Sequence, residues 1–267
     1  MRILLCLLVL LAVSCQKTGT MRSVHSPNIA KAIQDKKNLK VGIVRQYLPY
    51  SFKSESGQMG FDIDILKAVA TELKCSTSYE FIDAKDVTKS IRSRKVDLVI
   101  GVTATKSGSE VVDYSIPYNN FSSSLLLLKD SSINSLEGLH GKKVAYLSGA
   151  SSMDSNEVTL INAIMYKDPK KALEALKQGK VSAVKADSSI IGALNYEGEY
   201  KVIDDVSQIN KVVFAFAENQ SELRDVLNAS IMKFWENSTW QDIYETWFGE
   251  GSMYQKNSNF HINVIPR

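Results

Sequence analysis

The chain has 267 residues, which is longer than a typical single-core domain and enough for two modest ones. Its 44% apolar and 23% charged residues are ordinary for a globular protein and exclude a structureless chain. The 32 basic and 29 acidic side chains give a net charge of +3, which is too balanced to indicate binding to nucleic acid or to an anionic membrane surface.

The first residues have the pattern of an export signal. A short basic start, Met1-Arg2, precedes the apolar run ILLCLLVLLAV, which is too short to remain as a membrane-spanning helix. The sequence LAVSC resembles the lipobox of bacterial lipoproteins, with Ala12 where a leucine is usual. We therefore expect residues 1–15 to be a lipoprotein signal peptide with Cys15 as the lipidated, palmitate-bearing cysteine. An ordinary export signal that is cleaved nearby is the alternative.

The cysteines agree with an exported protein that is stabilised by its cores. Cys6 would leave with the signal and Cys15 would be acylated, so Cys75 remains alone and no disulfide can form in the folded part. Residues 16–36 lack sustained periodicity and are predicted to be a tether. No second apolar run is long enough to cross a membrane.

From residue 39 onwards, strand-like and helix-like patterns alternate. Strands are predicted at 39–44, 77–83 and 96–102, with helices at 60–74 and 84–95 between them. After an apolar segment at 122–129 the alternation restarts. The further elements are a turn and strand within 136–149, a helix at 168–180, a strand at 181–187, a helix at 188–196 and a strand at 200–204. This order predicts parallel sheets covered by helices on both faces.

The last part of the chain has a further strand at 211–216 and an aromatic-rich helical segment at 222–249. If that strand returns to the first unit, two crossings join the units and form a hinge. The predicted fold class is therefore α/β, with two lobes that are each a mostly parallel sheet flanked by helices and are joined by two hinge strands. The predicted division is lobe 1 at 37–126 and 217–250, lobe 2 at 127–216, and a tail at 251–267.

No pattern for catalysis or for a metal is found. The three histidines lack metal-ligand spacing, and no nucleophile elbow, phosphate loop or dinucleotide fingerprint is present. Asp62 and Asp64, at a helix start, are expected to favour the helix dipole. We expect no metal and no cofactor.

Several residues at strand ends suggest a binding cleft, because ligands in open α/β sheets lie at the carboxyl ends of the strands. Tyr47 and Tyr50 follow the first strand, where core packing is an equally good interpretation. Asp187 ends a strand and precedes a helix, so it either caps that helix or pairs with a ligand ammonium. The stretch GVTATKSGSEVVDYSIPY, at 101–118, follows a core strand and is rich in glycines and hydroxyl side chains. Its Ser107-x-x-Glu110 spacing predicts a cap on a short helix.

The motifs GFDIDILKAVATEL, VDLVIGVTAT, VVDYSIPY, LEGLHGKKVAYLSGASS and ENSTWQDIYETWFG, in this order, resemble the family 3 solute-binding proteins. These are the extracytoplasmic receptors of polar amino-acid ABC importers, and the similarity is greatest to the glutamine-binding members. The resemblance runs from about Leu39 to Glu250. It implies the type II periplasmic-binding-protein fold, in which two lobes close over the ligand.

The resemblance also implies ligand-binding roles for residues that match its motifs. Tyr47 matches an aromatic lid, and Gly101 and Thr103 match groups that bond the ligand ammonium and carboxylate. Asp187 matches the acid that receives the ammonium. The second-lobe amides and hydroxyl that meet the carboxylate are matched by Gly149, Ala150 and Ser151.

One position departs from the family pattern. The family places an arginine that clamps the ligand carboxylate three residues after a threonine, and this chain has Gly108 there, after Thr105. A bidentate arginine–carboxylate pair is a strong contact, with charge-assisted bonds of about 1.5–3 kcal/mol each. Either Arg45 or Lys106 takes over the carboxylate, Arg45 being favoured, or the ligand has no carboxylate at this point.

The implied function is that of a lipid-anchored solute-binding receptor, without enzymatic activity, that captures a polar, glutamine-like amino acid or a related amine and delivers it to an ABC permease. It would be a monomer outside the cytoplasm, periplasmic or otherwise, without a nucleic-acid partner. The alternatives are a binding protein repurposed for interaction or sensing after loss of the arginine, and a dehydratase-type enzyme on the same fold.

Overall fold

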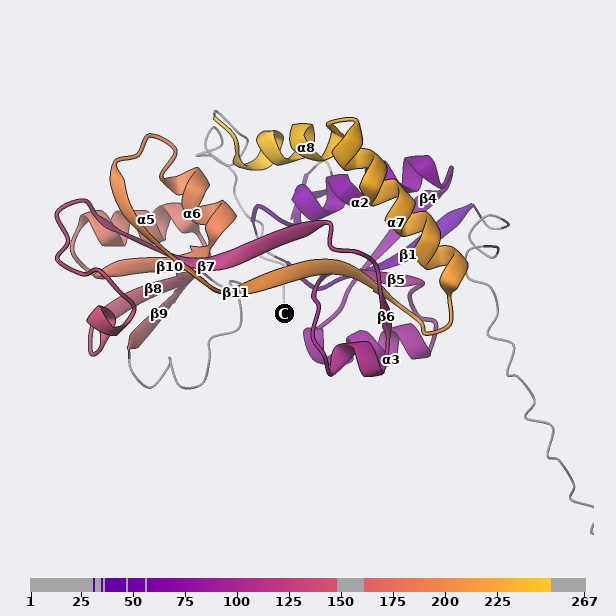
Figure 1. The fold of residues 1–267 in the computed structure, drawn as a ribbon, viewed down its shortest axis with the longest axis horizontal. Helices are drawn as coiled ribbons and strands as arrows, with labels where there is room; N and C mark the ends of the chain where they lie inside the picture. The colour runs from indigo at the N-terminus through magenta and orange to yellow at the C-terminus, as the bar shows by residue number, and fades with distance from the viewer. Residues whose placement is uncertain are drawn as a thin grey trace, which may run out of the picture.

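The computed structural model describes residues 31, 35, 37–46, 48–55, 57–147 and 161–250, without the side chains of 205–208. They form two α/β lobes joined by two long strands (Figure 1). The predicted signal peptide, Cys15, most of the tether and the tail lie outside the described residues. Within these residues, no helix is long and apolar enough to cross a membrane.

One sheet runs through both lobes. Its strand order is β4-β1-β5-β11-β7-β10-β8-β9, with β6 paired to β11. The pairs at the two ends of this order are parallel, whereas β5–β11, β11–β7 and β7–β10 in the middle are antiparallel. The strands are β1 (Asn38–Ile43), β4 (Ser76–Phe81), β5 (Leu98–Thr103), β6 (Asp113–Tyr114), β7 (Asn119–Leu128), β8 (Lys143–Leu147), β9 (Asn162–Tyr166), β10 (Ala183–Asp187) and β11 (Tyr200–Phe216), and β2 (Phe52–Ser54) pairs with β3 (Gly57–Met59) in a separate hairpin.

The helices cover the sheet in each lobe. Lobe 1 carries α2, α3, α7 and α8, and lobe 2 carries α5 and α6 (Figure 1). The predicted α/β class with two hinge strands is confirmed. The helices are α2 (Phe61–Glu72), α3 (Val87–Arg92), α5 (Pro169–Lys177), α6 (Ser188–Leu194), α7 (Ser221–Glu236) and α8 (Thr239–Phe248), with short 3₁₀ turns at Ala84–Asp86, Gly108–Glu110 and Glu137–Leu139.

The hinge is made by β7 and β11, which pair with each other along most of their length (Figure 1). The sequence predicted two separate strands at 200–204 and 211–216, which is wrong, because β11 is continuous over 17 residues. Its pairing with β7 shifts register between Asp205 and Asn210, so the intervening residues are accommodated as an irregularity within one strand. The sequence predicted boundaries between the lobes at 126/127 and 216/217. The first falls within β7 and the second at the end of β11, and this division into lobes stays a prediction.

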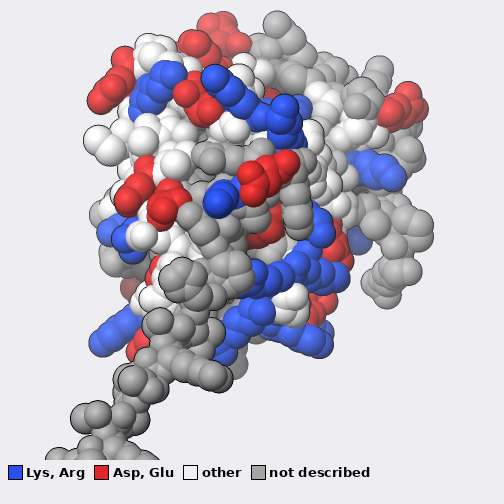
Figure 2. Space-filling view, turned by 90° about the vertical axis from the view of Figure 1, so that its right-hand side faces the viewer, with Lys and Arg blue, Asp and Glu red and all other residues white. Residues whose placement is uncertain are grey.

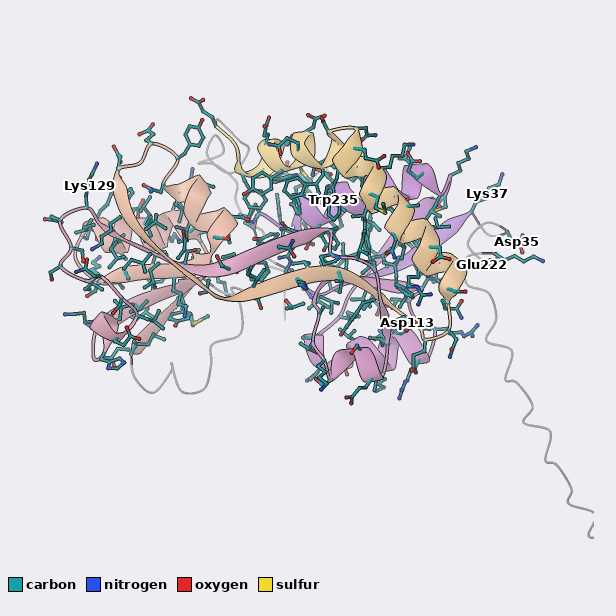
Figure 3. The ribbon with its side chains drawn as sticks, viewed as in Figure 1. Asp35, Lys37, Asp113, Lys129, Glu222 and Trp235 are labelled. Atoms are coloured by element: carbon teal, nitrogen blue, oxygen red, sulfur yellow. The ribbon has the colours of Figure 1, made fainter. Side chains whose placement is uncertain are left out.

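Aromatic side chains pack the helices of lobe 1 together. The ring of Phe61, at the start of α2, meets the rings of Tyr244 and Phe248 on α8 at centroid distances of 6.2 and 5.5 Å. Side chains fill the space between the strands and these helices (Figure 3). Asp113, labelled there near the start of α7, accepts a hydrogen bond from the backbone N–H of Asn219 at 3.1 Å. The aromatic-rich end of the sequence therefore belongs to the core of lobe 1.

The surface agrees with the balanced composition. Basic and acidic side chains are interspersed over the face of lobe 1 seen in Figure 2. Ion pairs such as Lys233–Glu72, at 2.9 Å, join neighbouring elements across this surface.

Candidate functional site

A hollow of about 360 Å³ lies in lobe 1 where β1 and β5 end. Arg45, Gly101 and Thr103, which the sequence predicts as ligand-binding residues, line it together. The remaining lining residues are Val44, Ala84, Val87, Thr88, Val102, Thr105, Gly108, Val112, Tyr114 and Phe121. The wall is apolar with a few hydroxyls, which is the usual make-up of a small-molecule site.

Arg45 belongs to a buried ion pair beneath this hollow. Its Nε and Nη2 donate to Oδ2 and Oδ1 of Asp62 at 2.9 and 2.6 Å. The guanidinium carbon lies 3.6 Å from the centroid of the Tyr50 ring. Arg45 is 6% exposed and Asp62 1%. Asp62 was expected to act on the helix dipole, and the structure shows that it is the counter-ion of Arg45.

Tyr118 links this ion pair to the ligand loop. Its hydroxyl donates to Asp62 Oδ1 and accepts from the backbone N–H of Gly101, both at 3.0 Å. Burial, followed by the negative charge of Asp62, raises the pKa of Tyr118 well above its usual range. The N–H of Gly101 is therefore already bonded and is not free to bind a ligand.

The backbone of Gly101 fixes how closely the loop approaches Arg45. Its φ is +76°, in the left-handed region that favours glycine. A Cβ at this position would lie 3.0 Å from Arg45 Cγ and 3.2 Å from its Cβ. Glycine therefore lets β5 and the segment after β1 pack against each other at the floor of the hollow.

The loop after β5 closes into a tight turn around Gly108. Its N–H donates to the Oγ1 of Thr105 at 3.0 Å, and its carbonyl accepts from Val111 and Val112. Ser107 was expected to cap this turn through its side chain, which is wrong, since no side-chain cap bond forms at Ser107. The Thr105 hydroxyl, three residues before Gly108, caps the turn instead by accepting the hydrogen bond from the Gly108 N–H.

Asp187 lies at the end of β10, next to the hinge. It is fully buried and stands before α6, but its side chain makes no cap hydrogen bond to that helix. In the antiparallel register it pairs with Ser123 on β7, two residues from Phe121, which lines the hollow. Since residues two apart on a strand share a face, the positions of Asp187 and the hollow adjoin along β7.

The other predicted site residues have different outcomes. Tyr47, Gly149, Ala150 and Ser151 lie outside the described residues. Lys106 is exposed and is not part of the lining of the hollow.

Sequence reasoning missed three polar side chains near the site. Asp62 and Tyr118 have partners distant in the sequence, so no local pattern signals their network. Ser123 Oγ is buried and has no hydrogen-bond partner among the described residues. The alternation of Phe121 and Ser123 on one strand was the only available signal for it.

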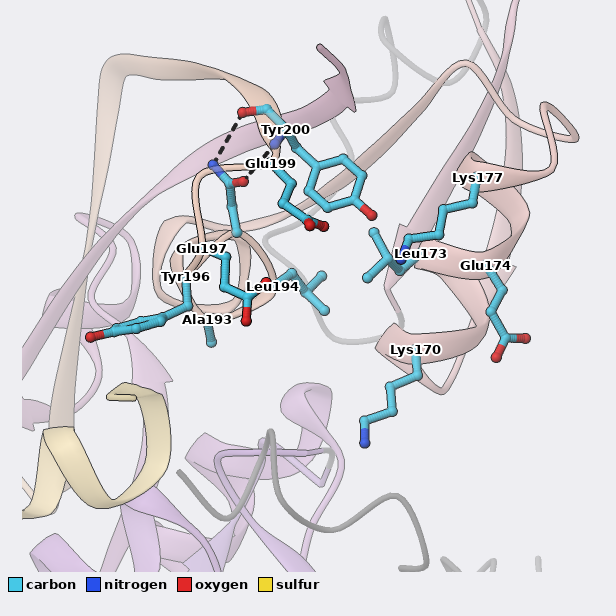
Figure 4. Close-up of a pocket in the computed structure, with 11 residues that line it drawn as sticks. Lys170, Leu173, Glu174, Lys177, Ala193, Leu194, Tyr196, Glu197, Glu199 and Tyr200 are labelled. Atoms are coloured by element: carbon cyan, nitrogen blue, oxygen red, sulfur yellow. Dashed lines mark hydrogen bonds between the residues drawn. The ribbon is translucent and has the colours of Figure 1, made fainter. Parts of the chain in front are cut away.

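A second hollow, of about 400 Å³, lies on lobe 2 between α5 and the turn that leads from α6 into β11 (Figure 4). Lys170 and Lys177 come from α5, and the Asn195 side chain bonds the backbone of Tyr200 on the opposite wall (Figure 4). None of the predicted ligand-binding residues lines it. Among the described residues, no group of three or more His, Cys, Asp or Glu could hold a metal ion.

Comparison with known proteins decides the family. Residues 39–250 match the bacterial extracellular solute-binding proteins, family 3. The chain belongs to this family. The similarity expected from the motifs is thus confirmed over the same range of residues.

Family 3 relatives named as amino-acid-binding proteins match most of this chain. The arginine-binding extracellular protein ArtP of Bacillus subtilis is 26% identical over 80% of this chain and 87% of its own length. The glutamine-binding protein GlnH of the same organism is 26% identical over 82% and 84%. Both of these relatives are thus named for the amino acid that they bind.

Solved structures give the same fold. An ancestral cationic amino acid solute-binding protein has a TM-score of 0.70 at 28% identity, covering 82% of this chain and 99% of its own. An ancestral amino-acid-binding protein described as a precursor of cyclohexadienyl dehydratase has a TM-score of 0.65 at 28% identity, covering 83% and 99%. The type II periplasmic-binding fold is therefore confirmed.

Proposed function

We propose that this protein is a lipid-anchored receptor that captures a small ligand bearing an ammonium group and delivers it to the permease of an ABC importer. Arg45, Gly101 and Thr103 form the lobe 1 side of the site, and Asp187 receives the ammonium from the hinge side. Tyr47, Gly149, Ala150 and Ser151 complete the proposed set. The ligand is a polar amino acid, glutamine-like in size, or a related amine.

The observation that carries this proposal is the adjacency of the hollow and Asp187 along one hinge strand. Phe121 lines the hollow and Ser123 pairs with Asp187 two residues later. The buried hydroxyl of Ser123, which has no hydrogen-bond partner among the described residues, adds a polar group at this junction. A ligand there would contact both lobes at once, and a ligand that bridges two lobes favours the closed arrangement.

Export, anchoring through Cys15 and a monomeric state remain part of the proposal. The family is extracellular, which agrees with the signal pattern at residues 1–15. Electrospray mass spectrometry of the protein purified from detergent-solubilised membranes tests the anchor. A mature N-terminus at Cys15 carrying acyl chains supports it, and a soluble chain cleaved elsewhere contradicts it.

A thermal-shift screen of amino acids and amines tests the binding function. A ligand at 100 times its Kd stabilises the folded state by about 2.7 kcal/mol. For a chain of this size that corresponds to about 5–10 °C in Tm. Asp187→Asn should abolish the shift, and a native circular dichroism spectrum of the unliganded variant checks that it is folded. No shift with any compound would contradict the receptor function.

A receptor turned to interaction or sensing is the second candidate, because Gly108 removes the expected carboxylate clamp. Recovery of a stoichiometric small ligand from purified protein distinguishes transport from this alternative. A dehydratase on the same fold is the weaker alternative, since such chemistry needs a general acid and cations for two carboxylates. Turnover of a prephenate-type substrate would establish it.

A further inference from the structure

The glycine at position 108 is explained by its neighbour Tyr114. The φ of Gly108 lies outside the left-handed region, so the backbone itself accepts any residue. A Cβ at this position, however, would overlap the hydroxyl oxygen of Tyr114 and lie 3.2 Å from its Cζ and 2.9 Å from Thr105 Oγ1. The Tyr114 hydroxyl therefore occupies the space through which a side chain at 108 would enter the hollow.

In the described part of the chain, Arg45 is the one cation in the lining of the hollow that could meet a ligand carboxylate. Of its lining residues only Arg45 is charged, and two nitrogens of that guanidinium bond the Asp62 carboxylate. This buried pair has no net charge. A ligand carboxylate placed in the hollow would lose its hydration and meet hydroxyls and neutral backbone groups, which compensate poorly for a buried charge.

The polar groups that remain suit an uncharged ligand end. Tyr114, Thr103 and Thr105 line the same hollow and carry hydroxyls, which both donate and accept hydrogen bonds. A primary amide, a hydroxyl or another neutral polar group can pair with such a set without the desolvation cost of an ion.

We infer that the lobe 1 hollow takes an uncharged polar end of an amine ligand, so that the receptor prefers amines and amino-acid amides that lack a free carboxylate, and that Tyr114 with Gly108 sets this specificity. This inference rests on the proposed receptor function. It assigns to Tyr114 a role in specificity and to Arg45 a role in supporting the site through Asp62.

The test compares pairs of ligands in which a neutral carboxamide replaces the carboxylate: L-glutamine with L-glutamine amide, L-arginine with L-arginine amide, and L-lysine with L-lysine amide. Isothermal titration calorimetry on the wild type should give at least a tenfold tighter Kd for the carboxylate-free member of the pair that fits, equivalent to about 1.4 kcal/mol. Wild-type protein that binds the free amino acid more tightly would overturn the inference and leave the receptor function standing. If no member of any pair binds, both fail.

Two variants test whether Tyr114 and Gly108 set the preference for carboxylate-free ligands. Gly108→Arg/Tyr114→Phe removes the hydroxyl that blocks position 108 and adds a cation, so the preference should shift at least tenfold towards the free amino acid. Tyr114→Phe alone should weaken binding of the carboxylate-free ligand without favouring the amino acid. Glu110→Gln, an exposed change in the same loop, is the matched control and should leave the ratio unchanged. An unchanged ratio in the double variant, with a native circular dichroism spectrum, would overturn the role of Tyr114.

Discussion

Asp62→Asn tests the buried ion pair that supports the site. The substitution keeps the shape of the side chain but leaves the Arg45 cation, which is 6% exposed, without its counter-ion. Removing one partner of a buried pair costs about 3–5 kcal/mol. The Tyr118 hydroxyl loses its charged acceptor as well, but it shares Oδ1 of Asp62 with Arg45, so the two losses do not add fully.

The expected loss of Tm is about 6–20 °C, at about 2–4 °C per kcal/mol for a domain of this size. Urea denaturation followed by circular dichroism, on protein refolded without ligand, measures the corresponding free energy of unfolding. Arg45→Met/Asp62→Leu removes both charges and should recover most of the loss, because a buried pair and a packed apolar pair have similar stability.

Lys67→Ala is the control for this experiment. Lys67 pairs with Asp64 at 3.0 Å on the exposed side of the same helix, with its side chain 52% exposed. Its removal should change the free energy of unfolding by less than about 0.5 kcal/mol. If Asp62→Asn costs no more than this control, the reasoning that Arg45 is committed to Asp62 is refuted.

Three further predictions concern neighbouring residues. The raised pKa of Tyr118 keeps this residue protonated in the folded state, whereas in the unfolded chain it ionises above about pH 10. The free energy of unfolding should therefore fall, through Tyr118, by up to about 1.4 kcal/mol per pH unit above that value. Tyr118→Phe should lack this part of the slope in urea titrations from pH 9 to 11.5, and equal slopes in the variant and the wild type would contradict the prediction. Gly101→Ala places a Cβ at φ +76° and against Arg45, so a loss of about 1–3 kcal/mol and weaker ligand binding are expected by denaturation and calorimetry, and an unchanged Tm would contradict the strain. Ser123→Ala should weaken ligand binding about tenfold, whereas Ser122→Ala, on the opposite face of β7, should not, and equal effects would remove Ser123 from the site.

The sequence predicts the framework of this fold because its periodic patterns are local. The apolar stripe of residues 60–74 predicts α2, and Pro169 and Gly179 mark the ends of α5, where Gly179 adopts a φ of +67°. The continuous β11 was missed because a polar stretch between two apolar runs has the composition of a loop, whereas the strand pairs with β7 on either side of that stretch, up to Asp205 and again from Asn210.

The site could be predicted only in part, for the same reason. Residues at strand ends, such as Gly101 and Thr103, are recognisable from position alone. The commitment of Arg45 to Asp62 depends on a loop and a helix that meet in space, 17 residues apart in the chain. The exclusion between Gly108 and Tyr114 likewise depends on where a side chain ends, which no spacing rule indicates.

If this protein holds a small amine-bearing ligand between its lobes, that ligand should stay bound through native purification. Mass spectrometry of the small molecules released by denaturing natively purified protein tests it most directly, with Asp187→Asn purified in parallel. We expect one dominant compound with an amino group and no free carboxylate, near one equivalent in the wild type and absent from the variant. Wild-type protein that releases no compound above the level of the variant would contradict it.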